Sequence, residues 1–455
     1  MSRKLFSFTM VILLLVTSLV VACAPTTPAP AAPAGGEVAT PAKEAPAKPA
    51  EPIEIQYWYG LGGKLGEVVA DFIKRFNESQ DEVKVVGVVL PDYATTAQKL
   101  QAAIAAGSPP AAAMLTVSAV QQFAHAGVLQ SLDDFIVADP EFNKDDIPDA
   151  YLIPGQYKGK QYALPIMGTT QVLYYRKDIY KELGIDPDML NTWEGLAEAA
   201  RKCMKVENGE VVRWGWEPMW GSGNLIDSAY SNGARILSED GKTVLIDQPE
   251  WVEVWDAFRK WIHEDKIMRI HYGGEGWAYW YDTIDDVLQG RACGYTGSAG
   301  DQGDLDFSIV AAHVQPYWSK WGDLDAIANP NMAAIPAGLP PEVQKAAFKW
   351  LEYYISPEMT AEWSVRTGYM PARNSAMETK ILKDYAVDHP QILVPPTQAA
   401  QAQPPFLDPT GGKIVDALSK AADKVEIENV PAAEALAEAK AEAQAALDEW
   451  LAKQK

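Results

Sequence analysis

The feature that most constrains the fold is an alternation of strand-like and helix-like segments along the first part of the chain. Residues 53–60, IEIQYWYG, carry apolar side chains at every second position, and residues 64–77 repeat them at helical spacing. Residues 83–90 are rich in β-branched side chains, as is typical of a strand buried on both faces of a parallel sheet. A helix over 94–107 and a strand over 111–117 continue the pattern. The alternation predicts an α/β fold.

The same kinds of segment follow in the rest of the chain. Residues 170–178 predict a strand, and Thr192 is placed to cap the helix that comes next. Residues 290–298 predict another strand, which ends in a loop of small residues. Helices are expected over residues 192–206, 249–265 and 431–455, with two more between 343 and 368 that are divided at Ser356-Pro357.

The N-terminus indicates export. Residues 2–4 include the basic Arg3 and Lys4, residues 5–21 are largely apolar, and Ala22 precedes Cys23 as in the site that a lipoprotein-processing peptidase recognises. The apolar stretch approaches the length of a transmembrane anchor, which is the alternative. We predict a lipoprotein signal peptide over residues 1–22 and a lipid anchor on Cys23, which would hold the protein outside the cytoplasm on the cell membrane.

The remaining chain is long enough for two domains. Residues 23–52 are mostly Ala and Pro, too poor in large apolar groups to form a core, and predict a semi-extended tether. Roughly 400 residues follow, more than one core usually supports. The 39 basic and 61 acidic residues give a net charge of -22, which argues against nucleic acid or anionic lipid as a partner.

Two cysteines lie beyond Cys23, at positions 203 and 293. In an oxidising compartment they can pair, but both stand in apolar-leaning contexts where buried free thiols are also common. The sequence leaves both possibilities open.

Motifs of common enzyme classes are missing from the sequence. It contains no phosphate-binding loop, no His-Glu-x-x-His and no Gly-x-Ser-x-Gly, and its five histidines lie far apart. The aspartates of residues 297–306, GSAGDQGDLD, do not fit a calcium loop and are expected to be solvated. A glycosidase with two acidic residues stays an alternative, because 61 acidic residues offer many pairs. No cofactor or metal is expected.

Aromatic residues crowd several predicted loops and strand ends. The runs RWGWEPMWGSGN, residues 213–224, and GEGWAYWYD, residues 274–282, are the densest. In α/β proteins ligands bind at the carboxyl ends of strands, and aromatic rings suit the C–H faces of a sugar. Packing between lobes is the alternative. Gly168-Thr169-Thr170 adds a close backbone approach and two hydroxyl groups that suit the edge of a polyol, although many such pairs are turn caps.

An ordered set of segments resembles a known family. YWYGLGGKLGEVVADFIKRFN, LQAAIAAGSPPAAAML, GVLQSLDDFI, YALPIMGTTQVLYYRKDIYKELGI, LQGRACGYTGS and WSVRTGYMPAR follow the cysteine and the tether. In this order they resemble the extracellular solute-binding proteins of bacterial ABC importers, and among them those that bind sugars, oligosaccharides and glycerol-3-phosphate. The resemblance covers residues 53–455.

The resemblance implies the fold of type II periplasmic binding proteins, with two α/β lobes, a ligand cleft and a hinge. Lobe one would comprise residues 53–163 and 308–368, and lobe two residues 164–307 and 369–455. PIMGTTQ would be the first crossing between the lobes. Such a protein is not an enzyme.

The resemblance also implies site residues. Tyr93 and Tyr369 match ligand-contacting tyrosines, Thr169 and Thr170 fall where glycerol-3-phosphate binders place a serine, and Gly297 and Ser298 lie in their small-residue loop. Two departures argue against a phosphate: Val117 stands where a glutamate aligns, and DPTGGKIVDAL lacks the expected arginine. The predicted ligand contacts are Trp58, Tyr59, Tyr93, Ser118, Thr169, Thr170, Trp216, Trp220, Gly297, Ser298 and Tyr369.

Together these observations predict a monomeric receptor that binds a sugar in its cleft and delivers it to a membrane permease. The alternatives are a binding protein for glycerol-3-phosphate or another polyol phosphate and, with less support, a secreted glycoside hydrolase.

Overall fold

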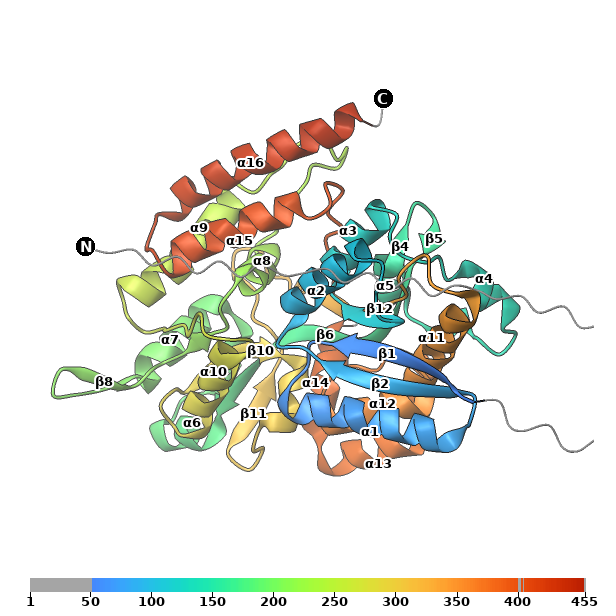
Figure 1. Ribbon diagram of the computed structural model, residues 1–455. Helices are drawn as coiled ribbons and strands as arrows, with labels where there is room; N and C mark the ends of the chain where they lie inside the picture. Colours follow the sequence, from blue (N-terminus) through green and yellow to red (C-terminus); the bar gives the residue numbers. More distant parts are fainter. Residues whose placement is uncertain (1–50, 400–401, 404, 454–455) are drawn as a thin grey trace, which may run out of the picture. The chain divides into compact units, whose positions relative to one another are not determined.

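The computed structural model describes residues 51–399, 402–403 and 405–453 (Figure 1). The predicted signal peptide, Cys23 and nearly all of the tether lie outside these residues. None of the described helices is both long enough and apolar enough to cross a membrane.

The described strands are β1 (Ile53–Tyr59), β2 (Val83–Val89), β3 (Ala112–Leu115), β4 (Gln156–Tyr157), β5 (Lys160–Gln161), β6 (Ala163–Arg176), β7 (Lys205–Glu207), β8 (Glu210–Arg213), β9 (Glu217–Pro218), β10 (Gly294–Ser298), β11 (Val310–His313) and β12 (Ala328–Ala334). The described α-helices are α1 (Gly63–Ser79), α2 (Tyr93–Ala105), α3 (Val117–His125), α4 (Asp133–Ala138), α5 (Asp149–Leu152), α6 (Lys177–Leu183), α7 (Trp193–Cys203), α8 (Ser222–Tyr230), α9 (Pro249–His263), α10 (Ala278–Leu288), α11 (Pro341–Tyr354), α12 (Pro357–Thr367), α13 (Lys380–Asp388), α14 (Val394–Ala399), α15 (Lys413–Glu426) and α16 (Ala432–Ala452). A 3₁₀ helix, η4, spans Ala299–Asp304. The strands and helices that the alternating pattern predicts are therefore present.

The long strand β6 joins two groups of strands. Its residues 163–170 pair with β12, which continues through β3 and β1 to β2, whereas residues 171–176 pair with β10 and β11. In Figure 1, β6 accordingly lies between β1 and β12 on one side and β10 and β11 on the other. The mixed strand directions agree with the predicted α/β class: β1 is parallel to β2 and β3, and β12 and β10 are antiparallel to β6.

One expectation about strands is wrong. The β2 strand, expected to be buried on both faces, ends the sheet at its edge, and its alternate residues are partly or fully exposed. Gly168, Thr169 and Thr170, expected where the chain crosses between the lobes, lie within β6, next to the position where its pairing changes from β12 to β10. Gly168 exchanges two backbone hydrogen bonds with Met370, and a Cβ at this position would lie 2.3 Å from the Tyr151 ring. The glycine therefore allows close packing inside a strand, not a turn.

Large buried aromatic side chains form two main cores. One contains Phe72, Trp350 and Trp363 and lies among β1, α1, α11 and α12. The other contains Trp193 and Trp255 and lies among α7, α9, α15 and α16. The predicted lobe boundaries stay a prediction, and helix α13, placed in lobe two, packs on α12 through Leu382 and Ala361.

The two internal cysteines form a disulfide. Cys203 ends α7, Cys293 directly precedes β10, and their Cα atoms lie 6.3 Å apart. Of the two possibilities that the sequence leaves open, the structure shows the bonded one.

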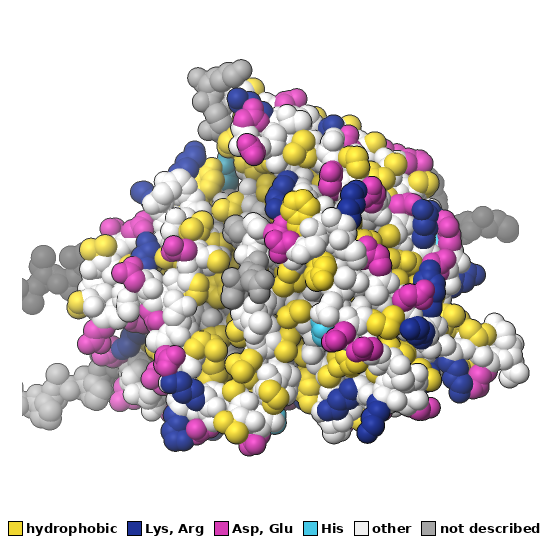
Figure 2. All heavy atoms as spheres, turned by 180° about the vertical axis from the view of Figure 1, so that it is seen from behind, with side chains coloured by type: hydrophobic (Ala, Val, Ile, Leu, Met, Phe, Trp, Pro, Cys, Tyr) yellow, Lys and Arg dark blue, Asp and Glu magenta, His cyan; other side chains and the backbone are white. Residues whose placement is uncertain are grey.

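Surface charges of both signs are mixed. In Figure 2, lysine and arginine side chains lie among aspartate and glutamate side chains over most of the visible face. Ion pairs such as Lys380–Asp384 and Lys74–Glu78 are part of this pattern in the described residues. A mixed surface of this kind does not offer nucleic acid a continuous basic patch on this face.

Candidate ligand-binding site

A cavity of about 250 Å³ lies where the two groups of strands meet. It is near the lower end of the range for small-molecule pockets, about 300–1,000 Å³. Its walls come from β6, β12, η4 and the first residues of α1, α2 and α10. The lining residues are Gly62, Leu65, Tyr93, Thr169, Thr170, Gln171, Trp277, Trp280, Tyr281, Ser298, Gly300, Asp301, Asp304, Asn329, Asn331 and Tyr369.

Hydroxyl groups line the side of the cavity formed by strands. The hydroxyl oxygens of Thr169 on β6 and Ser298 at the end of β10 lie 2.8 Å apart, and both residues are half-buried. Thr170 is 2% exposed and donates its hydroxyl proton to the carbonyl oxygen of Ile327. It also accepts a hydrogen bond from the side-chain amide of Gln398. Thr169 is therefore available to a ligand, whereas Thr170 is already bonded within the protein.

Aromatic rings form a further wall of the cavity. The rings of Tyr93 and Trp277 lie 5.3 Å apart between centroids at an interplanar angle of 76°, and those of Trp277 and Trp280 lie 5.9 Å apart at 84°. The indole of Trp277 also donates a hydrogen bond to the carbonyl of Gly60, which is 217 positions away. These contacts bring the start of α10 against residues that follow β1 and β2.

Two acidic side chains of η4 line the cavity. Asp301 is 5% exposed and accepts hydrogen bonds from the Trp280 indole, the Tyr295 hydroxyl and the Ser298 amide. Burial raises the pKa of Asp301 to about 7, against the lowering effect of these donors. Burial also raises the pKa of Asp304, although nearby Lys64 favours its charged form.

The expectation of a solvated acidic loop is therefore wrong for Asp301. It holds for Asp306, which is exposed. Asp301 is buried because its carboxylate fixes both Trp280 and the turn at Ser298, so its three donors compensate for the loss of water.

No lysine, arginine or histidine is among the residues that line this cavity. Lys64 is nearby, but its ammonium group donates to the carbonyl of Gly303 and lies 3.5 Å from Asp304, with the side chain 60% exposed. The cavity therefore lacks the bidentate arginine that phosphate recognition favours.

Comparison with known proteins identifies the family. The family model for bacterial extracellular solute-binding proteins matches residues 71–388, more than two thirds of the chain. The chain belongs to this family. A curated relative of the solute-binding protein is the sn-glycerol-3-phosphate-binding periplasmic protein UgpB of Yersinia pestis, 26% identical over 344 residues, which are 71% of this chain and 75% of the relative.

Solved structures show the fold of the solute-binding protein. UgpB from Mycobacterium tuberculosis in complex with glycerophosphocholine matches with a TM-score of 0.75 at 20% identity, over 88% of this chain and 99% of that one. The GacH receptor of Streptomyces glaucescens, solved unliganded and with acarbose, also matches with a TM-score of 0.75, at 16% identity and the same coverage. The predicted fold, that of type II periplasmic binding proteins, is confirmed.

Five of the predicted contacts of this solute-binding protein meet at the cavity. They are Tyr93, Thr169, Thr170, Ser298 and Tyr369. Gly297 is next to them but is not a lining residue: a Cβ there would lie 2.3 Å from the Tyr295 ring and 2.4 Å from an oxygen of Asp301. Its place in the site is therefore to keep Asp301 close to β10.

Two predicted contacts are core residues of the solute-binding protein. Trp216 is fully buried and donates its indole hydrogen to the hydroxyl of Thr296. Tyr59 is 2% exposed and stacks on Tyr57 inside the core around β1. Both side chains point into cores, so neither can touch a ligand in the cavity.

Three other predicted contacts lie outside the cavity. Trp58 packs near α2 and α3 and donates to the side chain of Gln56. Ser118 lies at the start of α3. Trp220 donates to Asp423 on α15 and meets the Tyr279 ring at 83°. None of the three is among the residues that line the cavity.

Several lining residues are not among the predicted contacts. Trp277, Trp280 and Tyr281 belong to an aromatic run that the sequence does reveal, and its position between strands was the usable signal. Asn329 and Asn331 lie on β12, where period-two spacing places them on one face, but short polar residues in a strand carry no comparable signal.

Proposed function

We propose that this protein captures a sugar, either a monosaccharide or an oligosaccharide, in the cavity at β6 and delivers it to the membrane permease of an ABC importer. The observation that carries the proposal is a cavity lined both by aromatic rings and by hydroxyl and amide groups, without a lysine, arginine or histidine among the lining residues. Such a combination is suited to an uncharged polyhydroxylated ligand.

The two walls have complementary tasks. Trp277 and Trp280 stand nearly perpendicular to each other, so their faces offer apolar surface to the C–H groups of a sugar ring from two directions. Thr169 and Ser298 each offer a hydroxyl, and Asn329 offers an amide. Hydroxyl and amide groups both donate and accept, as sugar hydroxyls require.

A polyol phosphate is the alternative ligand. The named relative from Yersinia pestis binds glycerol-3-phosphate, and the structure from Mycobacterium tuberculosis contains glycerophosphocholine. Against this alternative, the cavity presents Asp301 and Asp304, and Lys64 is already paired. A phosphate group would approach two carboxyl groups without an arginine to compensate.

The protein is proposed to bind without catalysis. Family members and structural neighbours are binding proteins. A glycosidase needs one carboxyl group as acid and a second as base or nucleophile. Here the carboxylate of Asp301 already accepts three hydrogen bonds from the protein, which suits a positioning role.

The proposed location, membrane anchor and lobe arrangement of the protein are those that the sequence predicts. The family places the protein outside the cytoplasm. We propose a lipid anchor on Cys23, a tether over residues 23–52, a monomer, and two lobes at the predicted boundaries that close on the ligand by bending at the segments between them.

The test is a titration of the chain from Ala24 onward with a panel of neutral sugars, glycerol-3-phosphate and glycerophosphocholine. Tryptophan fluorescence reports binding, and chromatography of the recovered ligand reports turnover. We expect saturable binding of a neutral sugar, recovered unchanged, with a dissociation constant near micromolar, or about -8 kcal/mol. Exclusive binding of phosphate esters would favour the alternative ligand, and sugar hydrolysis would refute a receptor.

A further inference from the structure

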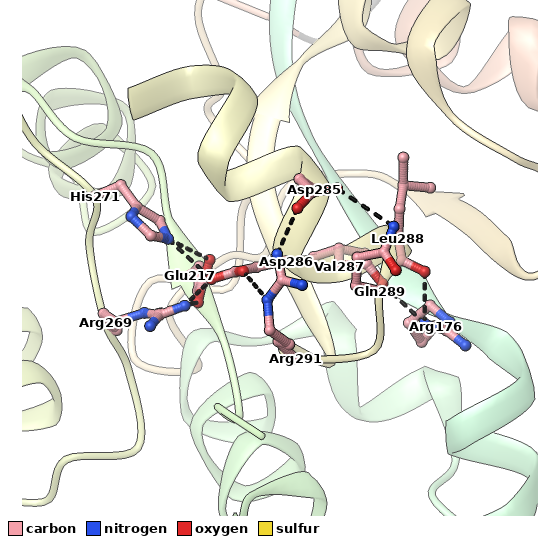
Figure 3. Close-up of polar contacts among 10 residues, drawn as sticks. All are labelled: Arg176, Glu217, Arg269, His271, Asp285, Asp286, Val287, Leu288, Gln289 and Arg291. Carbon is pink, nitrogen blue, oxygen red and sulfur yellow. Dashed lines mark hydrogen bonds and ion pairs between the residues drawn. The ribbon is translucent and has the colours of Figure 1, made fainter. Parts of the chain in front are cut away.

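A second cluster of polar side chains lies outside the ligand cavity (Figure 3). It unites Glu217 on β9, His271 in the segment between α9 and α10, and Asp286 near the end of α10. One ligand atom from each side chain can be chosen so that all lie within 4.8 Å of one another. In the sequence these residues are up to 69 positions apart, so spacing gives no sign of them.

One atom of this cluster lacks a partner. The side chain of Glu217 is 0% exposed, yet its Oε2 receives no hydrogen bond from any described residue. His271 Nε2 is 3.7 Å from this oxygen, too far for a good hydrogen bond, and 2.9 Å from Asp286 Oδ2. An unpaired buried carboxylate oxygen is costly, so a native protein ordinarily provides something for it.

Two arginines hold the other oxygens of the two carboxylates. Arg269 donates through Nε and Nη2 to Glu217 Oε1, at 3.0 and 2.6 Å, and Arg291 donates to Asp286 Oδ1. Glu217 Oε2 and Asp286 Oδ2 are left on the side of His271 (Figure 3). Metal sites commonly have this arrangement, in which the ligating carboxylates are themselves hydrogen-bonded from behind.

Arg269 is the competitor for such an ion, because its Nη2 also contacts Asp286 Oδ2. A bound ion would have to displace this guanidinium. Its side chain is 32% exposed, and its guanidinium lies over the Trp214 ring at 5.3 Å. Because the guanidinium is planar, Nε and Nη2 would leave the two carboxylates together, and the ion would take their place.

We propose that Glu217, His271 and Asp286 form a binding site for a divalent transition-metal ion of the zinc type. One imidazole nitrogen and two carboxylate oxygens suit Zn²⁺, with water in the remaining position. Mg²⁺ and Ca²⁺ prefer shells made only of oxygen. The site is separate from the sugar cavity and does not depend on the proposed function.

The ion would brace the helix that carries the aromatic wall. Asp286 lies on the last turns of α10, where Arg176 from β6 donates to the carbonyls of Val287 and Leu288 at 2.9 and 3.3 Å. The other end of this helix carries Trp280. A metal that links Asp286 to β9 would thus fix α10 relative to the sheet, and we assign it a structural task.

The first experiment uses the unaltered protein. The chain from Ala24 onward is treated with a chelator, dialysed into metal-free buffer and titrated with ZnCl₂ by calorimetry, while the d–d spectrum of added Co²⁺ reports the ligands. We expect one ion per chain, a dissociation constant of about 10 µM or tighter, a higher Tm, and no comparable binding of Mg²⁺ or Ca²⁺. Absence of saturable Zn²⁺ binding would overturn the proposal and would leave Arg269 and Arg291 as the cations that pair with the cluster.

The second experiment locates the ion. The His271 side chain is 25% exposed, so the protein should tolerate His271→Gln. We expect this substitution to weaken Zn²⁺ binding by at least about tenfold. His263→Gln is the matched control, because His263 is another half-buried histidine, on α9, and has no carboxylate of this cluster beside it. Equal Zn²⁺ affinity in His271→Gln and the unaltered protein, or equal loss in both variants, would refute the assignment.

Discussion

Thr169 and Ser298 are 129 positions apart in the chain, and their hydroxyl oxygens lie 2.8 Å from each other at the wall of the ligand cavity. The contact exists because β6 and β10 pair side by side, with Gln171 opposite Ser298. Each hydroxyl can use its remaining hydrogen-bonding capacity toward a ligand. Next to this pair, the hydroxyl of Thr170 is already bonded to the Ile327 carbonyl and the Gln398 amide.

The two threonines are therefore expected to respond differently to substitution. Thr169→Ala should weaken sugar binding by about 3- to 10-fold, the worth of one hydrogen bond, and leave the Tm of the ligand-free protein nearly unchanged. Thr170→Ala should lower the free energy of unfolding by about 1–3 kcal/mol, because the Ile327 carbonyl and the Gln398 amide lose a buried partner. Fluorescence titration and urea unfolding measure the two effects. Thr170→Ser, which keeps the hydroxyl, is the control, and a large loss of stability in Thr169→Ala would contradict the division.

The indole of Trp280 has two tasks, a ring face for the ligand and an Nε1 hydrogen bond to Asp301. Trp280→Ala should weaken sugar binding by about 10- to 100-fold, since it removes a large apolar contact. The sugar affinity of Trp280→Phe should lie between those of Trp280→Ala and the unaltered protein. This variant keeps an aromatic ring but leaves Asp301 with one hydrogen-bond donor fewer. Isothermal titration calorimetry measures all three affinities. Trp58→Ala removes a tryptophan outside the cavity and should bind as the unaltered protein does; the opposite ranking would refute the aromatic wall.

The sequence predicts the fold well because the period of apolar residues reports it directly. Helix α7 begins after Thr192, which caps it through the Gly195 amide, and α12 ends at Gly368 in a left-handed conformation, as local chemistry requires. The period of apolar residues does not predict which strand lies at the edge of the sheet. The composition of β2 is that of a central strand, but which strand ends a sheet depends on connections between distant segments.

The site was harder to predict, because the sequence around an aromatic residue does not tell whether its side chain packs in a core or lines a cleft. Trp216 and Trp280 both belong to aromatic runs, yet a hydrogen bond to Thr296 holds one in the core and a bond to Asp301 holds the other at the cavity. These partners are fixed only when β10 and η4 are in place. The burial of Asp301 is not predictable from the sequence for the same reason: its three donors lie on α10 and β10, and η4 meets both only in the folded chain.

The disulfide ties the end of α7 to the start of β10 and closes a loop between positions that are 90 residues apart. Reduction should lower the free energy of unfolding by about 2–4 kcal/mol, chiefly because the unfolded chain gains freedom. Guanidinium unfolding with and without dithiothreitol measures this difference in the chain from Ala24 onward, which has no other cysteine. Thiol titration of the unfolded, unreduced protein should find no free thiol, and two free thiols per chain would contradict the pairing.

Asp301 makes the stability of the ligand-free protein depend on pH in a defined direction. Burial raises its pKa to about 7 in the folded protein, whereas an aspartate in the unfolded chain has a pKa of about 3.9. The folded state therefore binds this proton more tightly, and the stabilising contribution present at low pH is lost as the pH rises through 7. Relative to Asp301→Asn, the unaltered protein should lose about 2 kcal/mol of unfolding free energy between pH 5 and pH 8, as measured by urea unfolding. Asp306→Asn changes an exposed aspartate of the same loop. Its unfolding free energy should change with pH as that of the unaltered protein does over this range. If the unfolding free energy of Asp301→Asn shows the same pH dependence as that of the unaltered protein, the Asp301 carboxyl group titrates as it does in water. The assignment of Asp301 as a buried hydrogen-bond partner of Trp280 would then be wrong.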